Sequence, residues 1–142
     1  YRLDEQIRQS IVMMEPKWSE KEIEFDVDMM DVEYLGNENL ICHVWDNLLS
    51  NAIKFSPCGG TIYIRMMPEG EKIRFSIENE GPQISEYSMK HIFDKFYQGD
   101  SSHKQEGNGL GLALVKQILN LCMGTVSVEN IPGSGCRFTV IL

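Results

Sequence analysis

Apolar residues recur at helical spacing at the start of the chain, with acidic residues in the first turn. The apolar positions are Leu3, Ile7, Ile11 and Met14. Steps of three and four residues bring such positions to one face of a helix. The pattern therefore predicts a helix over residues 3–14, which Pro16 stops because proline cannot continue a helix.

The same spacing predicts two further helices and one short helical piece. One helix covers roughly residues 38–56, with Asn37 or Asn39 as its N-cap, and a Pro-Cys-Gly-Gly run ends it. Residues 86–96 contain the short piece, and the last helix covers about residues 110–122. We expect the apolar faces of these helices to be buried against a sheet.

Alternating apolar and polar residues indicate strands elsewhere in the chain. The stretch EIEFDVD, residues 22–28, has this alternation as a single strand. Residues 61–67 and 72–78 flank a PEGE turn, and residues 125–131 and 136–142 flank a PGSG turn. Each pair is typical of a β-hairpin, so most of the sheet should be antiparallel.

The order of these elements predicts an α/β fold. We expect a two-layer sandwich, with a mixed, mostly antiparallel sheet and helices packed on one of its faces. The region over about residues 82–109 is long and polar for a compact domain, which is typical of a mobile lid. The chain of 142 residues fits a single domain, residues 1–142. It begins at Tyr1 without a methionine, so we expect it to be a fragment of a longer protein.

The chain carries a formal net charge of −8 at pH 7. This charge disfavours nucleic-acid and anionic-membrane surfaces, because both need a basic footprint. An anionic ligand would have to be held locally, by a few cations, backbone N–H groups or a metal ion. No apolar run approaches the about 20 residues of a membrane helix. The four cysteines show no C-x-x-C pair and no zinc spacing, so we expect reduced thiols.

The helix expected at residues 38–56 carries amides on its polar side. Its apolar side chains share one broad arc, and they are Ile41, Val44, Trp45, Leu48, Leu49, Ala52 and Ile53. Asn47, Asn51 and Lys54 share a narrow wedge opposite that arc. A solvated face is the alternative interpretation, but asparagine is a weak helix former. Two amide oxygens one turn apart suit a hard cation, and Lys54 suits an accompanying anion, so the wedge indicates a polar ligand site.

A second constellation is GNGLGLALV, residues 107–115. Gly107, Gly109 and Gly111 alternate with other residues and lead directly into an apolar helix. Alternate glycines let backbone N–H groups approach a ligand, and the partly positive start of a helix suits phosphate. A flexible hinge is an alternative that does not exclude phosphate binding. The surrounding sequence excludes a Rossmann fingerprint, a P-loop and the glycine loop of protein kinases.

With both motifs in place, the sequence resembles the ATP-binding catalytic domain of bacterial sensor histidine kinases. That family belongs to the superfamily shared with gyrase, chaperone and mismatch-repair ATPases (GHKL). Four boxes occur in the family's order: NLLSNAIKFS as the N box, IENEGPQIS as the G1 box, IFDKFYQGDSS as the F box and GNGLGLAL as the G2 box. The resemblance covers nearly the whole chain. It implies the family's fold, a mixed sheet backed by helices, with ATP bound between those helices under a mobile lid.

The resemblance also implies roles for particular residues. Asn51 would coordinate Mg²⁺ through its amide oxygen, Asn47 would contact the phosphates beside it, and Lys54 would reach toward a phosphate. Phe55 would lie near the base or ribose, and Tyr97 would contact the nucleotide as the lid closes. The backbone wrapping the triphosphate would be Gly107, Asn108, Gly109, Leu110, Gly111 and Leu112. Further nucleotide contacts would come from the G1 box, at Asn79, Gly81 and Ile84.

Asn47 bears on the reaction as well as on binding. At the matching position, the ATPase branches of the superfamily have a glutamate that activates water, whereas an amide cannot act as a general base. The resemblance therefore implies poor hydrolysis of ATP and transfer of its γ-phosphoryl group to a protein histidine. The candidate catalytic residues are Asn47, Lys54 and Gln98.

Three positions depart from the family's pattern. Asn79 stands where the G1 box usually has the aspartate that reads the adenine amino group, and Gln83 stands where the box has its second glycine. The loss of a charge-assisted hydrogen bond predicts weaker ATP binding and poorer discrimination against guanine. Gln98 stands where many members have arginine, so transfer would be slower unless Lys95 or Lys104 supplies the missing charge.

The phosphoacceptor histidine is expected outside this chain. None of His43, His91 and His103 lies in the H-E-x-x-x-P context of the family's acceptor. The resemblance therefore implies two partners: the dimerisation and phosphoacceptor helices of the same protein, and a response regulator. It also implies a homodimeric parent in the bacterial cell membrane, with this segment on the cytoplasmic side and not itself inserted.

Two other functions remain open from the sequence. A protein-serine kinase of the same superfamily, of the anti-sigma-factor type, shares the N and G boxes. A non-catalytic docking module would explain the altered G1 box, although the intact Asn51, Lys54 and G2 glycines argue against a degenerate site. A DNA-binding domain is disfavoured by the negative charge.

Overall fold

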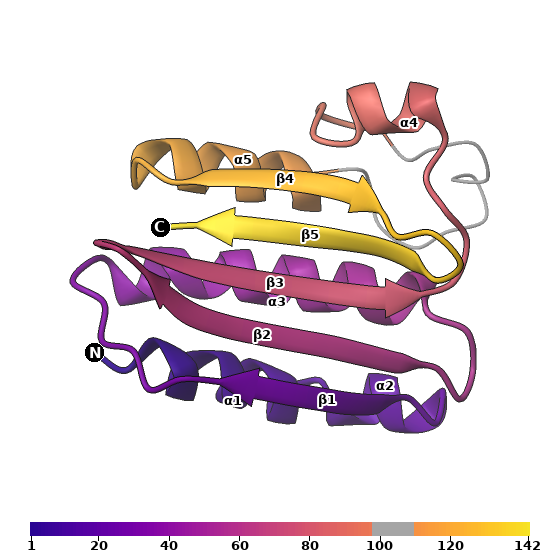
Figure 1. The fold of residues 1–142 in the computed structure, drawn as a ribbon, viewed down its shortest axis with the longest axis horizontal. Coiled ribbons are helices and arrows are strands. Elements are labelled where there is room, and N and C mark those ends of the chain that lie inside the picture. Colours follow the sequence, from indigo (N-terminus) through magenta and orange to yellow (C-terminus); the bar gives the residue numbers. More distant parts are fainter. Residues whose placement is uncertain (98–109) are drawn as a thin grey trace.

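The computed structural model describes residues 1–97 and 110–142. Helices and strands are interspersed along these residues (Figure 1). In chain order they are α1 (Leu3–Met13), α2 (Glu15–Glu20), β1 (Glu24–Met29), α3 (Glu38–Phe55), β2 (Thr61–Glu69), β3 (Lys72–Glu80), α4 (Glu86–His91), α5 (Gly111–Leu121), β4 (Thr125–Asn130) and β5 (Gly135–Ile141).

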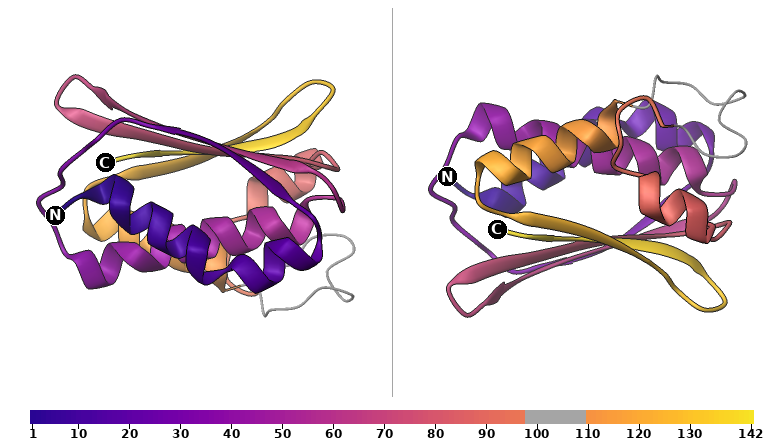
Figure 2. Two further views of the ribbon diagram at one scale, coloured as in Figure 1. Left: turned by 90° about the horizontal axis from the view of Figure 1, so that it is seen from below. Right: turned by 90° about the horizontal axis from the view of Figure 1, so that it is seen from above.

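The strands form one 5-stranded sheet in the order β1-β2-β3-β5-β4. β1 pairs in parallel with β2, and the remaining neighbours are antiparallel. Both predicted hairpins are present, as β2–β3 and β4–β5. Figure 2 shows α1, α3 and α5 on one side of this sheet, so the predicted two-layer α/β sandwich with a mixed sheet is confirmed.

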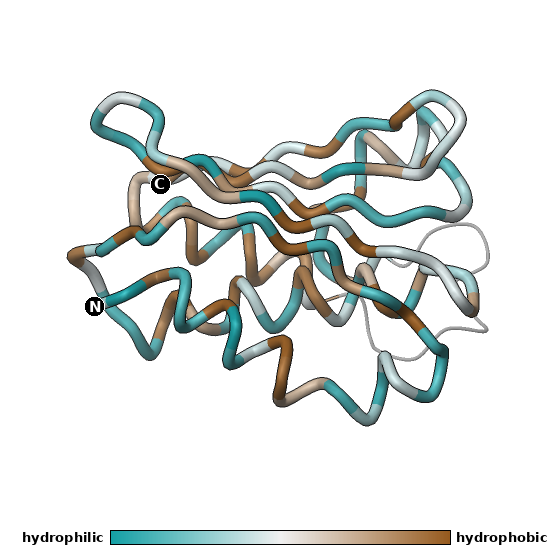
Figure 3. Tube along the Cα trace, turned by 60° about the horizontal axis from the view of Figure 1, so that its bottom comes forward, coloured by the Kyte–Doolittle hydropathy of each residue, from teal (hydrophilic) through white to brown (hydrophobic). Residues whose placement is uncertain are grey.

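The core lies between the helices and the inner face of the sheet. Hydrophobic and hydrophilic positions alternate along the strands in Figure 3, as a sheet with one buried face requires. The buried residues of α3 are the predicted apolar arc: Ile41, Val44, Trp45, Leu48, Leu49, Ala52 and Ile53. The Trp45 ring lies 4.7 Å from the Phe75 ring of β3, centroid to centroid, at the centre of this core.

The start of the chain differs from the expectation in one element. α1 ends at Met13, and Pro16 lies in the first turn of a second helix, α2. Proline fits that position because the first N–H groups of a helix have no partner within the helix. Pro16 therefore lies at the start of a second helix, where the sequence predicted only the end of one.

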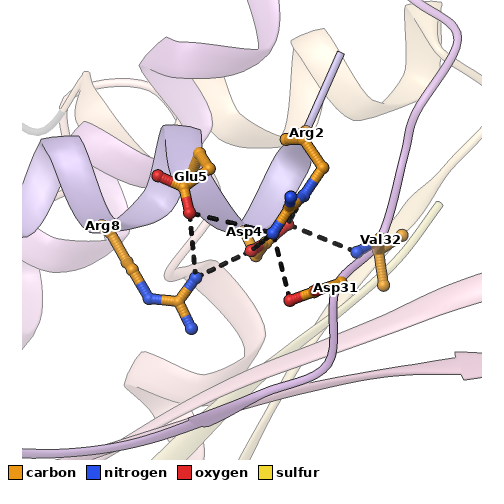
Figure 4. Close-up of polar contacts among 6 residues, drawn as sticks. All are labelled: Arg2, Asp4, Glu5, Arg8, Asp31 and Val32. Atoms are coloured by element: carbon orange, nitrogen blue, oxygen red, sulfur yellow. Dashed lines mark hydrogen bonds and ion pairs between the residues drawn. The ribbon is translucent and has the colours of Figure 1, made fainter.

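Asp4 anchors α1 to the segment that follows β1. Its carboxylate is buried, and it accepts hydrogen bonds from Arg2 at 2.6 Å, from Arg8 at 2.7 Å and from the Val32 N–H at 3.3 Å (Figure 4). Arg2 also lies 3.0 Å from the carboxylate of Asp31. The bonds from Arg2, and then those from Val32 and Arg8, hold the pKa of Asp4 well below its usual range, although burial opposes this shift. The cluster is a fully bonded structural contact.

Candidate functional site

The polar wedge of α3 turns away from the core, as its spacing predicts. Asn47, Asn51 and Lys54 are each half-buried, whereas the opposite arc is buried. The Asn47 side-chain amide donates to the His43 carbonyl at 2.7 Å, which fixes the direction of its oxygen Oδ1. That oxygen lies 2.7 Å from the point where a side chain at Gly111 would place its Cβ. Asn47 thus faces the start of α5 at close range.

Gly111 is the first residue of α5. The first N–H groups of a helix lack partners within the helix and carry a partial positive charge, so they bind anions well. A glycine here lets the Asn47 oxygen approach the backbone closely, because any side chain would meet that oxygen. Helix α3 and the G2 box therefore meet at one point, with an amide oxygen beside a helix N-terminus.

Asn51 lies one turn further along α3, on the same side as Asn47. Within residues 1–97 and 110–142, its carboxamide makes no hydrogen bond. A half-buried amide without a protein partner retains full capacity to bind a ligand. Its oxygen is of the type that Mg²⁺ and Ca²⁺ prefer, so Asn51 fits the role of a metal ligand.

The C-terminal end of α3 contacts the G1 box. The Lys54 ammonium lies 5.4 Å from the centroid of the Phe55 ring, within cation–π range. Gly81 has a φ of +133°, and a Cβ there would come within 2.6 Å of the Phe55 carbonyl oxygen. Only glycine fits both the backbone conformation and the close approach. The predicted nucleotide contacts Lys54, Phe55 and Gly81 are thus neighbours.

Lys21 stabilises this end of α3 from a distance of more than thirty residues along the chain. Its ammonium donates to the backbone carbonyls of Ile53 at 2.7 Å, Lys54 at 3.2 Å and Ser56 at 2.6 Å. The last carbonyls of a helix lack partners within the helix and attract cations. Lys21 therefore holds the backbone that carries Lys54 and Phe55, a role that no local sequence pattern indicates.

Asn79 lies on the inner face of the sheet, near the end of β3. Its side chain is 2% exposed, and its Nδ2 donates to the Glu80 carbonyl at 3.0 Å. Directly across the β3–β5 ladder is Cys136, whose thiol donates to Asn79 Oδ1 at 3.6 Å. Burial, with a smaller contribution from Glu78, raises the pKa of Cys136 to about 11, so this thiol is a neutral donor. The predicted base reader is therefore oriented by two neighbours.

The loop after β3 is held by β4 and the turn beyond it. Asn130 accepts from the Ile84 N–H and donates to the Ile84 carbonyl, both at 2.8 Å. Gln83 donates to the Ile131 carbonyl at 2.9 Å. Gln83, which replaces the second glycine of the G1 box, thus has a structural role in this loop. Asn130 was not predicted, because in the sequence it is only the end of an alternating strand.

Tyr97 packs on α4. Its hydroxyl forms a 2.6 Å hydrogen bond with Ser88 Oγ, and its ring lies 5.9 Å from the ring of His91 and 6.3 Å from that of Tyr87. These contacts, within the described residues, place Tyr97 beside α4 and not against α3. Its predicted contact with a nucleotide remains a prediction.

The sequence profile of the family described as "Histidine kinase-, DNA gyrase B-, and HSP90-like ATPase" matches residues 36–142. The chain belongs to this family. The predicted resemblance is thereby confirmed. The segment that matches the profile begins just before α3 and includes the N, G1, F and G2 boxes of this ATPase domain.

Relatives and solved structures agree with this assignment. The heme sensor protein HssS of Staphylococcus saprophyticus is 34% identical over 122 residues, which cover 86% of this chain and 26% of that protein. The mycobacterial sensor histidine kinase MprB has a TM-score of 0.92 at 27% identity, covering 100% of this chain and 95% of that one. Full-length ShkA in complex with AMPPNP has a TM-score of 0.86 at 27% identity, covering 99% of this chain and 30% of that one.

The match to MprB includes α1, α2 and β1, which precede the family profile. These elements are therefore part of the shared fold. None of the helices in the described parts of the chain is both long and apolar enough to cross a membrane. All four cysteines are free thiols, as predicted.

The ATPase domain brings most of the predicted site residues that lie in the described part of the chain into two groups. One group joins Asn47 to Gly111, flanked by Asn51 and by the half-buried Leu110 and Leu112. The other joins Phe55 to Gly81 near the end of β3. Four further predicted residues lie outside the described residues: Gln98, Gly107, Asn108 and Gly109.

Proposed function

We propose that this ATPase domain binds Mg²⁺–ATP and donates the γ-phosphoryl group to a histidine on a separate dimerisation domain of a sensor histidine kinase. A response regulator would then receive the phosphoryl group. One observation carries this proposal: the Asn47 oxygen faces the start of α5, while Asn51 beside it has no partner among the described residues. Amide oxygens beside a helix N-terminus suit a metal–phosphate ligand.

Each part of the site supplies a distinct interaction. The N–H groups at the start of α5, together with Gly107, Asn108 and Gly109, would bind the phosphates, and Lys54 would add a positive charge. Asn51 would hold the metal ion through its amide oxygen. When bound, Mg²⁺ neutralises charge on the phosphates and orients the group that is transferred. Asn47, oriented by the His43 carbonyl, would position the phosphates but cannot deprotonate water.

The other end of the site would receive the base. Asn79 faces the inner side of the sheet, and Phe55, Gly81 and Ile84 lie at the edge of the same region. An amide reads adenine less strongly than a carboxylate does, since it lacks a charge-assisted hydrogen bond. We therefore expect this domain to bind ATP more weakly than an aspartate-bearing relative does, with less discrimination against guanine.

The remaining roles are extensions of the same proposal. Tyr97 would contact the nucleotide when the region over about residues 82–109 closes as a lid, and Gln98 would contact the phosphoryl group without contributing charge. Residues 1–142 would act as one catalytic domain, on the cytoplasmic side of a dimeric, membrane-bound parent.

Two measurements test the proposal. AMPPNP with Mg²⁺ should raise the melting temperature of the domain by mass action, and Asn51→Ala should abolish the Mg²⁺-dependent part of this shift. Asn39→Ala is the matched control, because Asn39 is an exposed asparagine on the same helix. No stabilisation at millimolar nucleotide would identify a docking module instead.

The second measurement addresses the reaction. Labelled ATP should leave the isolated domain unlabelled, and it should label a dimerisation segment of the parent supplied in trans. The label should be acid-labile and alkali-stable, as expected of phosphohistidine. A stable label on a histidine of the isolated domain would contradict the proposed acceptor, and an acid-stable label on a partner would indicate the serine-kinase alternative.

A further inference from the structure

Three metal-ligating side chains gather on α3, one turn before Asn47. They are Cys42, His43 and Asp46, and each offers one ligand atom within 4.8 Å of the others. Cys42 and Asp46 are half-buried, and His43 is exposed. The cluster lies on the flank of α3, outside the set of residues proposed to bind the nucleotide.

The spacing of the cluster explains its geometry. Cys42 and Asp46 are four residues apart, and His43 and Asp46 are three apart, so each pair lies one turn apart on one side of the helix. Helix α3 is anchored at its N-terminus by Asn37, whose side chain accepts from the Leu40 N–H at 3.1 Å. The three ligands therefore project from a capped helical segment, so a metal ion would find their backbone already ordered.

The three side chains also retain capacity to bind a ligand. The Cys42 thiol donates to the Asn39 carbonyl at 3.1 Å, a local bond that a metal ion would replace. Among the described residues, the His43 ring and the Asp46 carboxylate make no hydrogen bond or ion pair. By contrast, the buried Asp4 accepts bonds from two arginines and a backbone N–H.

We propose that Cys42, His43 and Asp46 form a binding site for a divalent transition-metal ion of the Zn²⁺ type. Sulfur, nitrogen and carboxylate oxygen together select borderline ions such as Zn²⁺ and Co²⁺, whereas Mg²⁺ prefers oxygen ligands alone. Three protein ligands leave the fourth tetrahedral position for water or another ligand. This site is distinct from the magnesium position proposed at Asn51, and it does not depend on the nucleotide proposal.

The test uses the intact 142-residue chain with Co²⁺ as a spectroscopic probe and Mg²⁺ in excess to occupy oxygen sites. We expect one Co²⁺ per chain, with tetrahedral d–d bands and a thiolate charge-transfer band, both lost when Zn²⁺ displaces Co²⁺. Cys42→Ser should remove the charge-transfer band. Cys58→Ser, which changes an exposed cysteine outside the cluster, should leave the spectrum unchanged. His43→Gln and Asp46→Asn should each weaken Co²⁺ binding by more than about tenfold, the lower end of what loss of a supporting residue costs.

A second measurement guards against variants that fail to fold. Zn²⁺ should raise the melting temperature of the unmodified chain and of Cys58→Ser, but not that of Asp46→Asn. Without metal, Asp46→Asn should unfold at about the same temperature as the unmodified chain. The proposal is overturned if no thiolate band forms with the unmodified chain, if the band persists in Cys42→Ser, or if excess Mg²⁺ removes it. It is also overturned if Cys58→Ser loses the band as fully as Cys42→Ser.

Discussion

Two polar clusters on the helical layer differ in how far the protein satisfies them. Asp4 on α1 is fully buried, and it receives hydrogen bonds from Arg2, Arg8 and the Val32 N–H. Asn51 on α3 is half-buried, and it receives none within the described residues. A buried charge is tolerated only when it is well bonded, so the Asp4 cluster is a structural contact. An amide left unbonded at a helix surface is instead available to a ligand.

Asn79 lies between these two cases. It is buried like Asp4, but its oxygen receives only a weak thiol bond from Cys136 at 3.6 Å. Its amide nitrogen is used by the Glu80 carbonyl. A ligand could replace the weak thiol bond to this oxygen at little cost. The protein therefore holds Asn79, the predicted base reader, in place through its nitrogen but leaves its oxygen largely available.

The largest expected effect is on the Asp4 cluster. Asp4→Asn removes the buried anion that Arg2 and Arg8 share, and it should lower the free energy of unfolding by about 3 kcal/mol, since loss of one partner of a buried pair is costly. Both arginine side chains are about two-fifths exposed and can be rehydrated, which limits the loss. Urea unfolding measures it, and nucleotide affinity of the folded protein should not change.

The control for Asp4→Asn is Glu5→Gln. Glu5 is an exposed member of the same cluster, 3.8 Å from Arg2 and 3.6 Å from Arg8. Exposed pairs contribute at most about 1 kcal/mol, so Glu5→Gln should change the stability little. Equal effects of the two substitutions would contradict the assignment of Asp4 as the anchor.

The same cluster should give the domain an acid-sensitive stability. The pKa of Asp4 is lower in the folded than in the unfolded chain, mainly because of Arg2, so its contribution is complete above the unfolded pKa of about 3.9. The contribution is then lost as the pH falls below that value toward the folded pKa. Urea midpoints measured between pH 7 and strongly acidic pH should fall less steeply for Asp4→Asn. Parallel curves for the two proteins would show that other carboxylates dominate acid unfolding.

Gly111→Ala tests the site between α3 and α5, where polar groups are left for a ligand. The new Cβ would lie 2.7 Å from Asn47 Oδ1, so that amide must rotate or shift, which a side-chain end can do without unfolding the protein. We expect a stability change under about 1 kcal/mol but a roughly tenfold loss of nucleotide affinity, or about 1.4 kcal/mol. Titration calorimetry with AMPPNP measures the affinity. Lys116→Ala, at an exposed position of α5, is the control and should bind normally.

The smallest expected effect is a gain. Asn79→Asp should strengthen ATP binding by about 1 kcal/mol, because a charge-assisted bond replaces a neutral one. It should slightly destabilise the unliganded domain, since a carboxylate would face the Glu80 carbonyl at the position now held by the amide donor. Asn120→Asp adds the same charge at an exposed position of α5 and serves as the control. If Asn79→Asp leaves the ratio of ATP affinity to GTP affinity unchanged, Asn79 does not read the base.

Local patterns account for much of what the sequence predicted correctly. The apolar arc of α3 coincides with its buried residues because each turn of a helix repeats the same directions in space. Both hairpins follow from period-two alternation around short turns. The wedge of Asn47, Asn51 and Lys54 was visible for the same reason. The sequence left the N-cap open between Asn37 and Asn39, and the structure shows Asn37 in that role. The family assignment rests on these local boxes in their order.

Contacts between distant segments were not predictable in this way. Lys21 donates to a carbonyl at the end of α3 that is more than thirty residues away in the sequence. Asn130 forms hydrogen bonds with the backbone of Ile84, which is 46 residues away. Asp4 resembles an ordinary acidic residue in the first turn of a helix, and its burial beside Arg2, Arg8 and the Val32 N–H is visible only in the folded structure. Such contacts depend on how elements pack, which no short stretch of sequence encodes.

The sequence by itself determined most of the elements and the polar wedge of α3, since both follow from residue spacing along the chain. Its four boxes, in their order, carried the resemblance to the family. Only the tertiary structure decided which polar groups are satisfied by the protein. It satisfies Asp4, partly engages Asn79 through Cys136, and leaves Asn51 without a described partner. The physical reason is that a hydrogen bond needs two groups within about 3 Å, and folding brings such groups together from remote positions.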